Sequence, residues 1–375
     1  MSLFIGLMSG TSLDGVDGVL AELDPGARGP NAMRVLAYRQ AGFPDELRAR
    51  LLRLNSRGDD ELHHAALAAN ALVRIYAEVV DALLRQSTLI PAQVRAIGAH
   101  GQTVRHRPQE FDGTGYTLQL MNGALLAELS GIDVVCDLRS RDVAAGGQGA
   151  PLVPALHDAL FAMPGEDVAV LNLGGIGNLT LLPAEGVVRG FDCGPGNALM
   201  DLWSQRHQGH AYDAQGRWAA TGQIVMPLLQ RLLSEPFLRR VPPKSTGRDL
   251  FNAAWLDTAL QDMATTVATA DVQATLAEFS ARAAADALKL HAPRTRRLLV
   301  CGGGAFNDHL MQRLATHLPD MVVASSALAG VPPLQVEALA FAWLAQAFVS
   351  RQPGNLPAVT GARGPRVLGA FYPAT

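Results

Sequence analysis

The sequence predicts an α/β fold arranged in two domains. Short apolar segments with strand character alternate with longer segments in which apolar residues recur at helical spacing. A strand, a polar turn and a second strand open the chain at residues 1–24, and the same pattern returns at 168–191. A core built by 375 residues usually divides. We therefore expect an N-terminal domain of residues 1–165 plus 350–375 and a C-terminal domain of residues 166–349, with the boundary near Pro164-Gly165.

In the first half, the apolar patterns predict six strands and two helices. The strands are expected at 3–7, 15–23, 34–40, 94–99, 116–120 and 133–136, and the helices at 61–86 and 123–130. Residues 142–151 are too rich in Gly and Ala to suggest a regular element.

In the second half, five strands and six helices are expected. The strands are predicted at 168–173, 179–182, 187–191, 298–301 and 321–324. The helices are predicted at 197–206, 223–234, 252–262, 271–290, 308–317 and 334–348.

The composition excludes several classes of protein. With 31 Lys+Arg against 34 Asp+Glu and no basic run, the chain is a poor candidate for binding nucleic acid. Three widely separated cysteines, Cys136, Cys193 and Cys301, do not form a disulfide framework and favour a reducing cytoplasm. We find no signal peptide and no apolar run of the roughly 18 residues that cross a bilayer. The expected location is the cytoplasm, without a membrane partner.

Three glycine-rich loops follow predicted strands. They are Met8 to Asp17, Leu171 to Asn178 and Cys301 to Asn307. Glycine allows several backbone N–H groups to point one way and cradle an anion, and Asp14 or Asp17 could hold a metal through water. Each loop alone is equally well explained as an ordinary turn. Together, at strand ends, they favour a nucleotide site.

Two familiar nucleotide motifs are absent from the sequence. There is no G-x-x-x-x-G-K-[ST] segment, and no complete G-x-G-x-x-G follows the first strand. A P-loop NTPase and a Rossmann dehydrogenase are therefore disfavoured.

Asp192 is the candidate general base. It lies in the segment Gly190 to Asn197, after a predicted strand and before a helix that we expect Asn197 to cap. A carboxylate at a strand end is well placed to take a proton. The alternative is an Asp that only stabilises a turn, which is the commoner use of the residue.

Two polar loops carry side chains suited to an acidic amino sugar. They are Ala99 to Thr103 and Arg139 to Pro151, whose amide, imidazole and guanidinium groups can bind hydroxyls and a carboxylate. His100 could equally be a satisfied loop histidine, and its spacing from His106 does not suit zinc. Glu337 opens the last apolar helix, where a carboxylate ordinarily interacts with the helix dipole.

Taken together, these segments resemble the anhydro-N-acetylmuramic acid kinase family of the sugar kinase/Hsp70/actin superfamily. The similarity spans almost the whole chain. It is carried by residues 8–15, 98–103, 142–154, 190–197, 243–248 and 301–307.

The resemblance implies a two-domain actin-like ATPase fold with an interdomain active-site cleft. It implies a cytoplasmic enzyme that uses ATP, Mg²⁺ and water to convert 1,6-anhydro-N-acetylmuramic acid into N-acetylmuramic acid 6-phosphate during peptidoglycan recycling. A homodimer is implied by the resemblance alone.

The resemblance also implies roles for individual residues, with Asp192 as catalytic base. The nucleotide site is expected to comprise Gly10, Thr11, Ser12, Leu13, Asp14, Gly15, Val16, Asp17, Gly174, Gly175, Asn178, Gly302, Gly303, Gly304 and Asn307. The sugar is expected to contact His100, Gln102, Thr103, Arg139, Asp142, Gln148, Asp192 and Glu337. The resemblance does not define the Mg²⁺ ligands, apart from Asp14, which could hold the ion through water.

Three other functions remain open at this point. An actin-type nucleotide-binding module would have no need of the sugar-facing loops. An ordinary kinase would phosphorylate a free 6-hydroxyl group without opening a ring. A glycoside hydrolase with paired carboxylates would open the ring without ATP.

Overall fold

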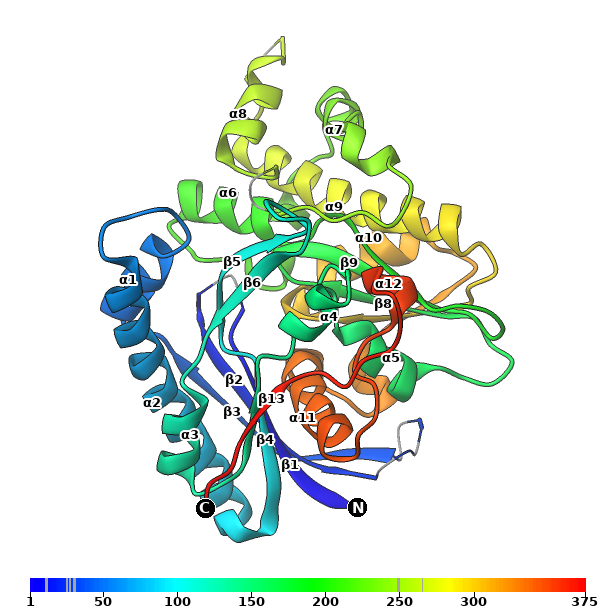
Figure 1. Ribbon diagram of the computed structural model, residues 1–375. Coiled ribbons are helices and arrows are strands. Elements are labelled where there is room, and N and C mark those ends of the chain that lie inside the picture. Colours follow the sequence, from blue (N-terminus) through cyan, green and yellow to red (C-terminus); the bar gives the residue numbers. More distant parts are fainter. Residues whose placement is uncertain (11–12, 25, 27, 30–31, 248–249, 265) are drawn as a thin grey trace. The chain divides into compact units, whose positions relative to one another are not determined.

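A computed structural model describes residues 1–375 apart from 11–12, 25, 27, 30–31, 248–249 and 265 (Figure 1). The chain forms two compact units: unit 1 comprises Met1–Leu160 and Leu334–Thr375, and unit 2 comprises Phe161–Pro333. Each unit is described by itself below.

Unit 1 contains a six-stranded sheet, a separate two-stranded hairpin and seven helices among its described residues. The strands are β1 (Ser2–Met8), β2 (Gly15–Leu23), β3 (Met33–Gly42), β4 (Val94–Ala99), β5 (Gln102–Pro108), β6 (Gly115–Leu120), β7 (Val134–Cys136) and β13 (Ala370–Tyr372). The helices are α1 (Asp45–Arg53), α2 (Glu61–Ser87), α3 (Gly123–Ser130), α4 (Ser140–Ala144), α5 (Val153–Phe161, at the junction with unit 2), α11 (Val336–Val349) and α12 (Pro357–Thr360).

The sheet of unit 1 has the strand order β13-β7-β4-β1-β2-β3. Strand β1 pairs antiparallel with β2 and parallel with β4. Helix α2 packs on one face and α11 on the other, because Gly18 faces Val79 of α2 while Gly6 and Gly98 face α11. The buried apolar side chains between α2 and the sheet form the main core of this unit.

Two glycines let α11 lie directly against the sheet. A Cβ atom on Gly6 would stand 1.9 Å from the Ala338 carbonyl oxygen, and one on Gly98 would stand 1.9 Å from that of Phe341. The helix therefore belongs to unit 1. This differs from the sequence prediction, which assigned residues up to 349 to the second domain and placed the boundary near residue 165 rather than after residue 160.

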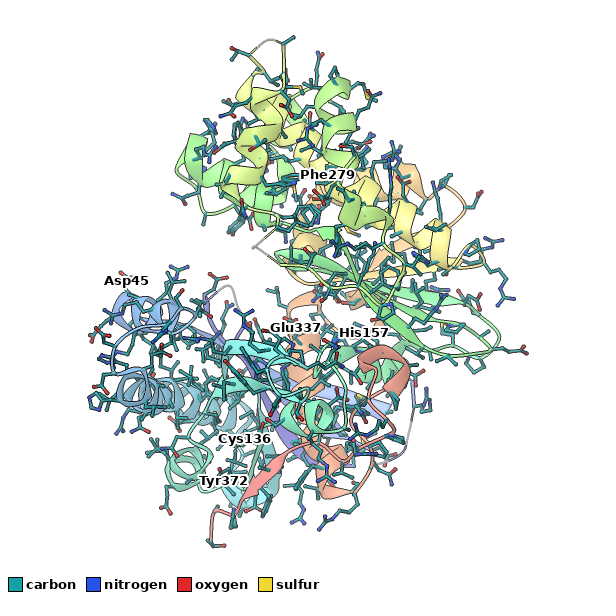
Figure 2. All side chains as sticks on the ribbon, turned by 45° about the horizontal axis from the view of Figure 1, so that its top comes forward. Asp45, Cys136, His157, Phe279, Glu337 and Tyr372 are labelled. Atoms are coloured by element: carbon teal, nitrogen blue, oxygen red, sulfur yellow. The ribbon has the colours of Figure 1, made fainter. Side chains whose placement is uncertain are left out.

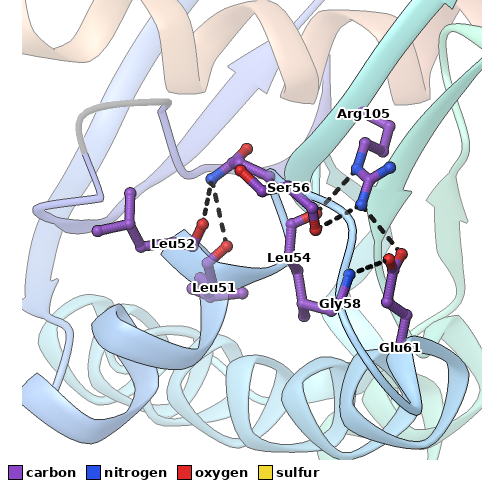
Figure 3. A network of polar contacts seen from close by, with 8 residues as sticks. Leu51, Leu52, Leu54, Ser56, Gly58, Glu61 and Arg105 are labelled. Carbon is purple, nitrogen blue, oxygen red and sulfur yellow. Dashed lines mark hydrogen bonds and ion pairs between the residues drawn. The ribbon is translucent and has the colours of Figure 1, made fainter.

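The β5–β6 hairpin is anchored by Arg105 to the segment between α1 and α2 (Figure 3). Its guanidinium donates to the carbonyl oxygens of Leu54 at 3.0 Å and Ser56 at 2.7 Å, and to the Glu61 carboxylate at 2.9 Å. Glu61 in turn accepts from the Gly58 N–H. This network fixes the position of β5 relative to the segment between α1 and α2.

Unit 2 contains one five-stranded sheet and five further helices among its described residues. The strands are β8 (Val168–Leu173), β9 (Ile176–Leu182), β10 (Arg189–Pro195), β11 (Arg297–Cys301) and β12 (Val322–Ser325). The helices are α6 (Ala198–Gln208), α7 (Met226–Leu233), α8 (Ala253–Gln261), α9 (Thr269–His291) and α10 (Asp308–His317).

The two sheets repeat one topology. In unit 2 the order is β10-β9-β8-β11-β12, which corresponds to β3-β2-β1-β4-β7 of unit 1. In both, an antiparallel hairpin opens the sheet and a parallel strand follows on the far side of the first strand. The expected α/β fold with two related units is thereby confirmed.

Several local predictions need correction. Asp192 lies within β10 and not after a strand, because the pairing with β9 continues through Pro195. Part of the expected irregular loop forms α4, and Gln102 begins β5. Asn197 precedes α6 but does not cap it: its Nδ2 donates to the Leu173 carbonyl instead. Within the described residues, no helix is both long enough and apolar enough to cross a membrane.

Candidate functional site

Unit 1 brings three of the predicted loops together. The buried Ser9 hydroxyl donates to the Gly101 carbonyl at 3.0 Å and shares a hydrogen bond with the Tyr76 hydroxyl. Gln102 Nε2 donates to the Gly10 carbonyl at 3.1 Å. Through these hydrogen bonds, the segment that follows β4 supports the first glycine loop.

His100 connects this loop to Arg139. Its Nδ1 lies 3.1 Å from the Ser9 carbonyl, and its Nε2 accepts from Nε of Arg139 at 3.0 Å. The ring also packs against Phe341. Burial, together with the Arg139 charge, lowers the pKa of His100 to about 3. His100 is therefore a neutral Nδ1–H tautomer with both nitrogens engaged, and it orients Arg139. Its predicted contact with the sugar stays a prediction.

The Arg139 guanidinium is held in a fixed direction. Besides its bond to His100, Nη1 donates to the Gly149 carbonyl at 2.8 Å. Burial lowers the pKa of Arg139 to about 10, against the attraction of Glu337 and Asp142, and the group stays charged at neutral pH. Glu337, labelled in Figure 2, lies half-buried in the first turn of α11. Arg139 and Glu337 therefore attract each other electrostatically within unit 1.

Asp142 has the surroundings of a structural residue, and its predicted sugar contact stays a prediction. The side chain is fully buried. Its Oδ1 accepts from Asn355 Nδ2 at 2.6 Å and from the Thr360 hydroxyl at 2.8 Å, while Oδ2 accepts from the Gly149 N–H at 2.8 Å. Because these donors surround the carboxylate inside the protein, Asp142 shapes the 146–149 loop.

The remaining predicted sugar residues of unit 1 differ in exposure. Gln102 is fully buried, so it braces the Gly10 loop and does not face solvent. Thr103 is half-buried and its hydroxyl accepts from Gln119. The Gln148 side chain is exposed, while its backbone N–H donates to the Thr360 carbonyl. Thr103 and Gln148, with Arg139 and Glu337, are the candidates of this unit that are not fully buried.

The first glycine loop places two carboxylates near each other. Asp17 is half-buried and accepts from the Tyr38 hydroxyl, while Asp14 is exposed and pairs with Arg48 at 3.3 Å. Burial, with the nearby Asp14 charge, raises the pKa of Asp17, against the Tyr38 hydrogen bond. Among the described residues, His, Cys, Asp and Glu side chains form no group of three that could hold a metal.

Other residues predicted in this loop have structural roles. The Leu13 and Val16 side chains lie in the core of unit 1, and the Leu13 N–H already donates to the Gly10 carbonyl. Gly15 is required by the approach of β3, since a Cβ there would stand 2.2 Å from the Ala41 carbonyl oxygen. Thr11 and Ser12 lie outside the described residues.

In unit 2, three glycine segments pack against one another. The Gly174 carbonyl accepts from the Asn197 N–H at 2.8 Å, and the Gly175 carbonyl accepts from the Gly196 N–H at 3.0 Å. A Cβ on Gly302 would stand 2.4 Å from Oδ1 of Asn172. Two of the three predicted glycine loops, those of residues 171–178 and 301–307, thus lie against each other within this unit. Gly303 and Gly304 begin a short 3-10 helix, η6 (Gly303–Phe306).

Asn307 has a structural role that the sequence prediction did not include. Its Oδ1 accepts from the Leu310 N–H at 2.9 Å and so caps α10. A nucleotide contact would have to use the amide nitrogen of this side chain.

A row of polar side chains crosses the sheet of unit 2 next to these glycines. Asp192 lies opposite Asn178 in the β10–β9 register, and Asn178 lies opposite Asn172 in the β9–β8 register. Residues directly opposite in a sheet point to the same face. Asn172 was missed as a site residue, although its symmetry with Asn178 about the Gly174-Gly175 turn is visible in the sequence.

Asp192 has the properties of a general base. Its Oδ2 accepts from the Thr246 N–H at 2.9 Å, the one hydrogen bond that the described residues give to this carboxylate. Burial raises the pKa of Asp192 to about 6, against the opposing effects of the Thr246 N–H and the Lys244 charge. A carboxylate with this pKa is ionised at neutral pH and is a stronger base than an ordinary Asp.

Comparison with known proteins identifies the family. The family model for anhydro-N-acetylmuramic acid kinase matches residues 2–374. A protein named anhydro-N-acetylmuramic acid kinase from Variovorax paradoxus is 62% identical over 99% of both chains. One of the same name from Bordetella petrii is 62% identical over 99% of this chain and 96% of that one.

Solved structures give more distant likenesses. A ROK family glucokinase from Streptomyces griseus in complex with glucose and AMPPNP has a TM-score of 0.42 and 13% identity, covering 92% of this chain and 99% of that chain. The family assignment rests on the sequence relatives, which span the full length of the chain. This chain belongs to the anhydro-N-acetylmuramic acid kinase family.

Proposed function

We propose that the chain opens the 1,6-anhydro ring of 1,6-anhydro-N-acetylmuramic acid with water and transfers the γ-phosphoryl group of ATP to O6, with Asp192 as general base. Family membership makes the chain a phosphotransferase with an alcohol acceptor that serves peptidoglycan recycling. The observation that supports the proposed base is the half-buried carboxylate of Asp192, which accepts one hydrogen bond from the described residues and whose pKa burial raises to about 6.

The chemistry requires one proton acceptor. The substrate has no free 6-hydroxyl group, since O6 is bonded to C1. Asp192 takes a proton from water as the water oxygen attacks C1. The C1–O6 bond breaks, and O6 forms a bond to the γ-phosphorus as ADP leaves. The oxygen that leaves carbon is thereby captured by phosphorus, and no free alkoxide accumulates. A general base typically contributes about 10²–10⁴-fold to the rate.

The nucleotide is proposed to bind through backbone groups of the glycine loops. In unit 1 these belong to the Gly10 loop, and in unit 2 to Gly174, Gly175 and the Gly302–Gly304 segment. Asn172 and Asn178 add amide groups on the face that carries Asp192. Backbone N–H groups in such loops stabilise phosphoryl charge without having to reorganise.

Mg²⁺ fits the acidic pair of the first loop. Mg²⁺ in phosphoryl-transfer sites is bound by one or two carboxylates together with phosphate oxygens and water. Asp14 and Asp17, which interact electrostatically, supply such a pair, and we propose that they hold the ion. When bound, Mg²⁺ neutralises charge on the transferred phosphoryl group.

The sugar is proposed to bind through the polar side chains of unit 1 that are not fully buried. Arg139, aimed by His100, suits the lactyl carboxylate, while Thr103, Gln148 and Glu337 suit hydroxyl and amide groups. His100, Gln102 and Asp142 support these groups from inside the protein.

The test is the product formed from 1,6-anhydro-N-acetylmuramic acid in ¹⁸O-labelled water with Mg-ATP. The expected product carries one phosphoryl group and, at early times, one ¹⁸O at C1. Ring opening in the absence of ATP would instead indicate a hydrolase. Phosphorylation only of sugars with a free 6-hydroxyl group would indicate an ordinary sugar kinase.

A further inference from the structure

We propose that Lys244 is a positioning residue for Asp192: its buried ammonium group fixes residues 242–247, here called the 242–247 segment, whose backbone holds the Asp192 carboxylate. The inference deepens the proposed function and rests on the role of Asp192 as base. Nothing in the sequence patterns or in the resemblance assigned a role to this lysine.

Lys244 is buried in a pocket of carbonyl oxygens and aromatic rings. Only 9% of the residue is exposed. Its Nζ donates to the carbonyl of Leu238 at 2.9 Å and to that of Phe237 at 3.3 Å. It also lies 4.9 Å from the centre of the Phe237 ring and 5.9 Å from that of Phe191. Phe191 is the neighbour of Asp192 in β10, so the ammonium group lies beside the strand that carries the base.

The backbone of the 242–247 segment makes two hydrogen bonds to Asp192. The Lys244 carbonyl accepts from the Asp192 N–H at 3.1 Å, and the Thr246 N–H donates to Asp192 Oδ2 at 2.9 Å. One residue therefore anchors the segment through its side chain and contacts β10 through its carbonyl. If the ammonium group were lost, both contacts to Asp192 would lose their anchor.

Burying an ammonium group is costly unless its interactions compensate. An apolar side chain of similar length would fill the same space beside Phe191 and Phe237 without that cost. The charge, however, acts on Asp192: burial raises the pKa of this carboxyl, and the Lys244 charge opposes the rise. The Lys244 charge thus keeps Asp192 ionised near neutral pH, while burial keeps the pKa of Asp192 above that of an ordinary Asp.

The other ionisable groups around this pair are few among the described residues. The Cys193 thiol follows Asp192 in β10, and burial raises the pKa of that thiol to about 12, so it is neutral. Burial lowers the pKa of Lys244, while Cys193 and Asp192 oppose that effect and the Arg240 charge adds to it. Burial and the Lys244 charge in turn lower the pKa of His291. Among the described residues, Lys244 is therefore the charged side chain that acts on the Asp192 carboxylate.

The test compares pH profiles of kcat/KM for uncharged and charged variants. Lys244→Met removes the charge and both hydrogen bonds, while Lys244→Gln removes the charge but keeps a donor. In both variants we expect the acid limb to move to higher pH by about one unit, because a carboxylate without its cation is harder to ionise. The corresponding loss is about tenfold well below the midpoint and much smaller above it.

Two further variants serve as controls. Lys244→Arg keeps the charge, so its midpoint should stay near that of the wild type even if kcat falls. Lys289 is the only other lysine in the sequence and lies exposed near the end of α9, so Lys289→Met should leave the whole profile unchanged. Circular dichroism and thermal unfolding check that each variant is folded. If Lys244→Met does not fold, Lys244→Gln decides.

The outcomes separate this inference from the proposed function. A folded Lys244→Gln with reduced kcat but a wild-type midpoint would overturn the inference and leave Lys244 as a structural residue only. Asp192→Asn is measured in the same series. If Asp192→Asn keeps its turnover, the proposed role of Asp192 as base is wrong, regardless of the pH profiles of the Lys244 variants.

Discussion

Asp142 and Asp192 both lie in glycine-rich segments and were both predicted to contact the sugar, yet their surroundings differ. The Asp142 carboxylate is fully buried and accepts hydrogen bonds from Asn355, Thr360 and Gly149. Asp192 is half-buried and, from the residues that the structure describes, accepts one hydrogen bond, from Thr246. The donors around each carboxylate therefore distinguish the structural surroundings of Asp142 from those of the proposed base, a difference that residue type and loop position did not show.

The difference has a simple physical origin. A carboxylate surrounded by fixed donors is stabilised in its ionised form and therefore takes a proton less readily, and its hydrogen bonds are strong because they are charge-assisted. A carboxylate that is desolvated but poorly hydrogen-bonded is held as a stronger base. The following predictions test this contrast, beginning with the largest expected effect.

Replacing Asp192 by Asn should abolish turnover while leaving ligand binding intact. The amide has nearly the same shape and can still accept from the Thr246 N–H, but it takes no proton from water. We expect kcat to fall by about 10²–10⁴-fold. Calorimetric titration with a non-hydrolysable ATP analogue and with the anhydro sugar measures binding. Loss of both binding events would assign Asp192 to structure.

Replacing Asp142 by Ala should act on stability first. The change would leave the Asn355 amide, the Thr360 hydroxyl and the Gly149 N–H without their acceptor in a buried place. We expect the free energy of unfolding to fall by about 3 kcal/mol, as measured by urea denaturation.

The matched control for Asp142 is Asp81→Asn, at an exposed carboxylate of α2 that pairs with Arg85. That change should alter stability by less than about 0.5 kcal/mol. The pH midpoint of kcat/KM should not move in Asp142→Ala, in contrast to Lys244→Gln. A shifted midpoint with unchanged stability would contradict the structural role of Asp142.

Replacing His100 by Ala should have the smallest effect, mainly on KM for the sugar. Without the ring, Arg139 loses the acceptor of its Nε–H group and is oriented less well. We expect KM to rise about tenfold, equivalent to about 1.4 kcal/mol of binding energy, with little change in kcat. Steady-state kinetics with varied sugar measures both constants. A large fall in kcat at constant KM would mean that His100 takes part in the chemistry.

The pH dependence of stability gives a second readout for His100. Its pKa is about 3 in the folded protein and about 6.5 when unfolded. Because the unfolded chain binds the proton more readily, the contribution of His100 to stability is complete above pH 6.5 and is lost as the pH falls toward 3. His100→Ala should therefore lose less stability than the wild type over this range.

Much of the local structure follows from the sequence. The helices α3 and α10 and the strands β4 and β8 have the predicted bounds, because each is a single apolar pattern closed by glycine or a polar cap. The glycine loops were found for the same reason. Asn172 was not among the predicted site residues, but it lies in one of these loop segments. Its placement opposite Asn178, with the Gly174-Gly175 turn between them, can be read from the sequence.

Only the tertiary structure decided the role of each polar side chain and the unit to which α11 belongs. Asn355 and Thr360 reach Asp142 across more than two hundred residues, and Gly6 and Gly98 accept α11 from far along the chain. Periodicity and turn chemistry act over a few neighbouring residues, so the sequence by itself determined the elements and the loops. Burial and hydrogen-bond saturation depend on contacts between distant segments, and these distinguish the proposed base Asp192 from the supporting residues Asp142 and His100.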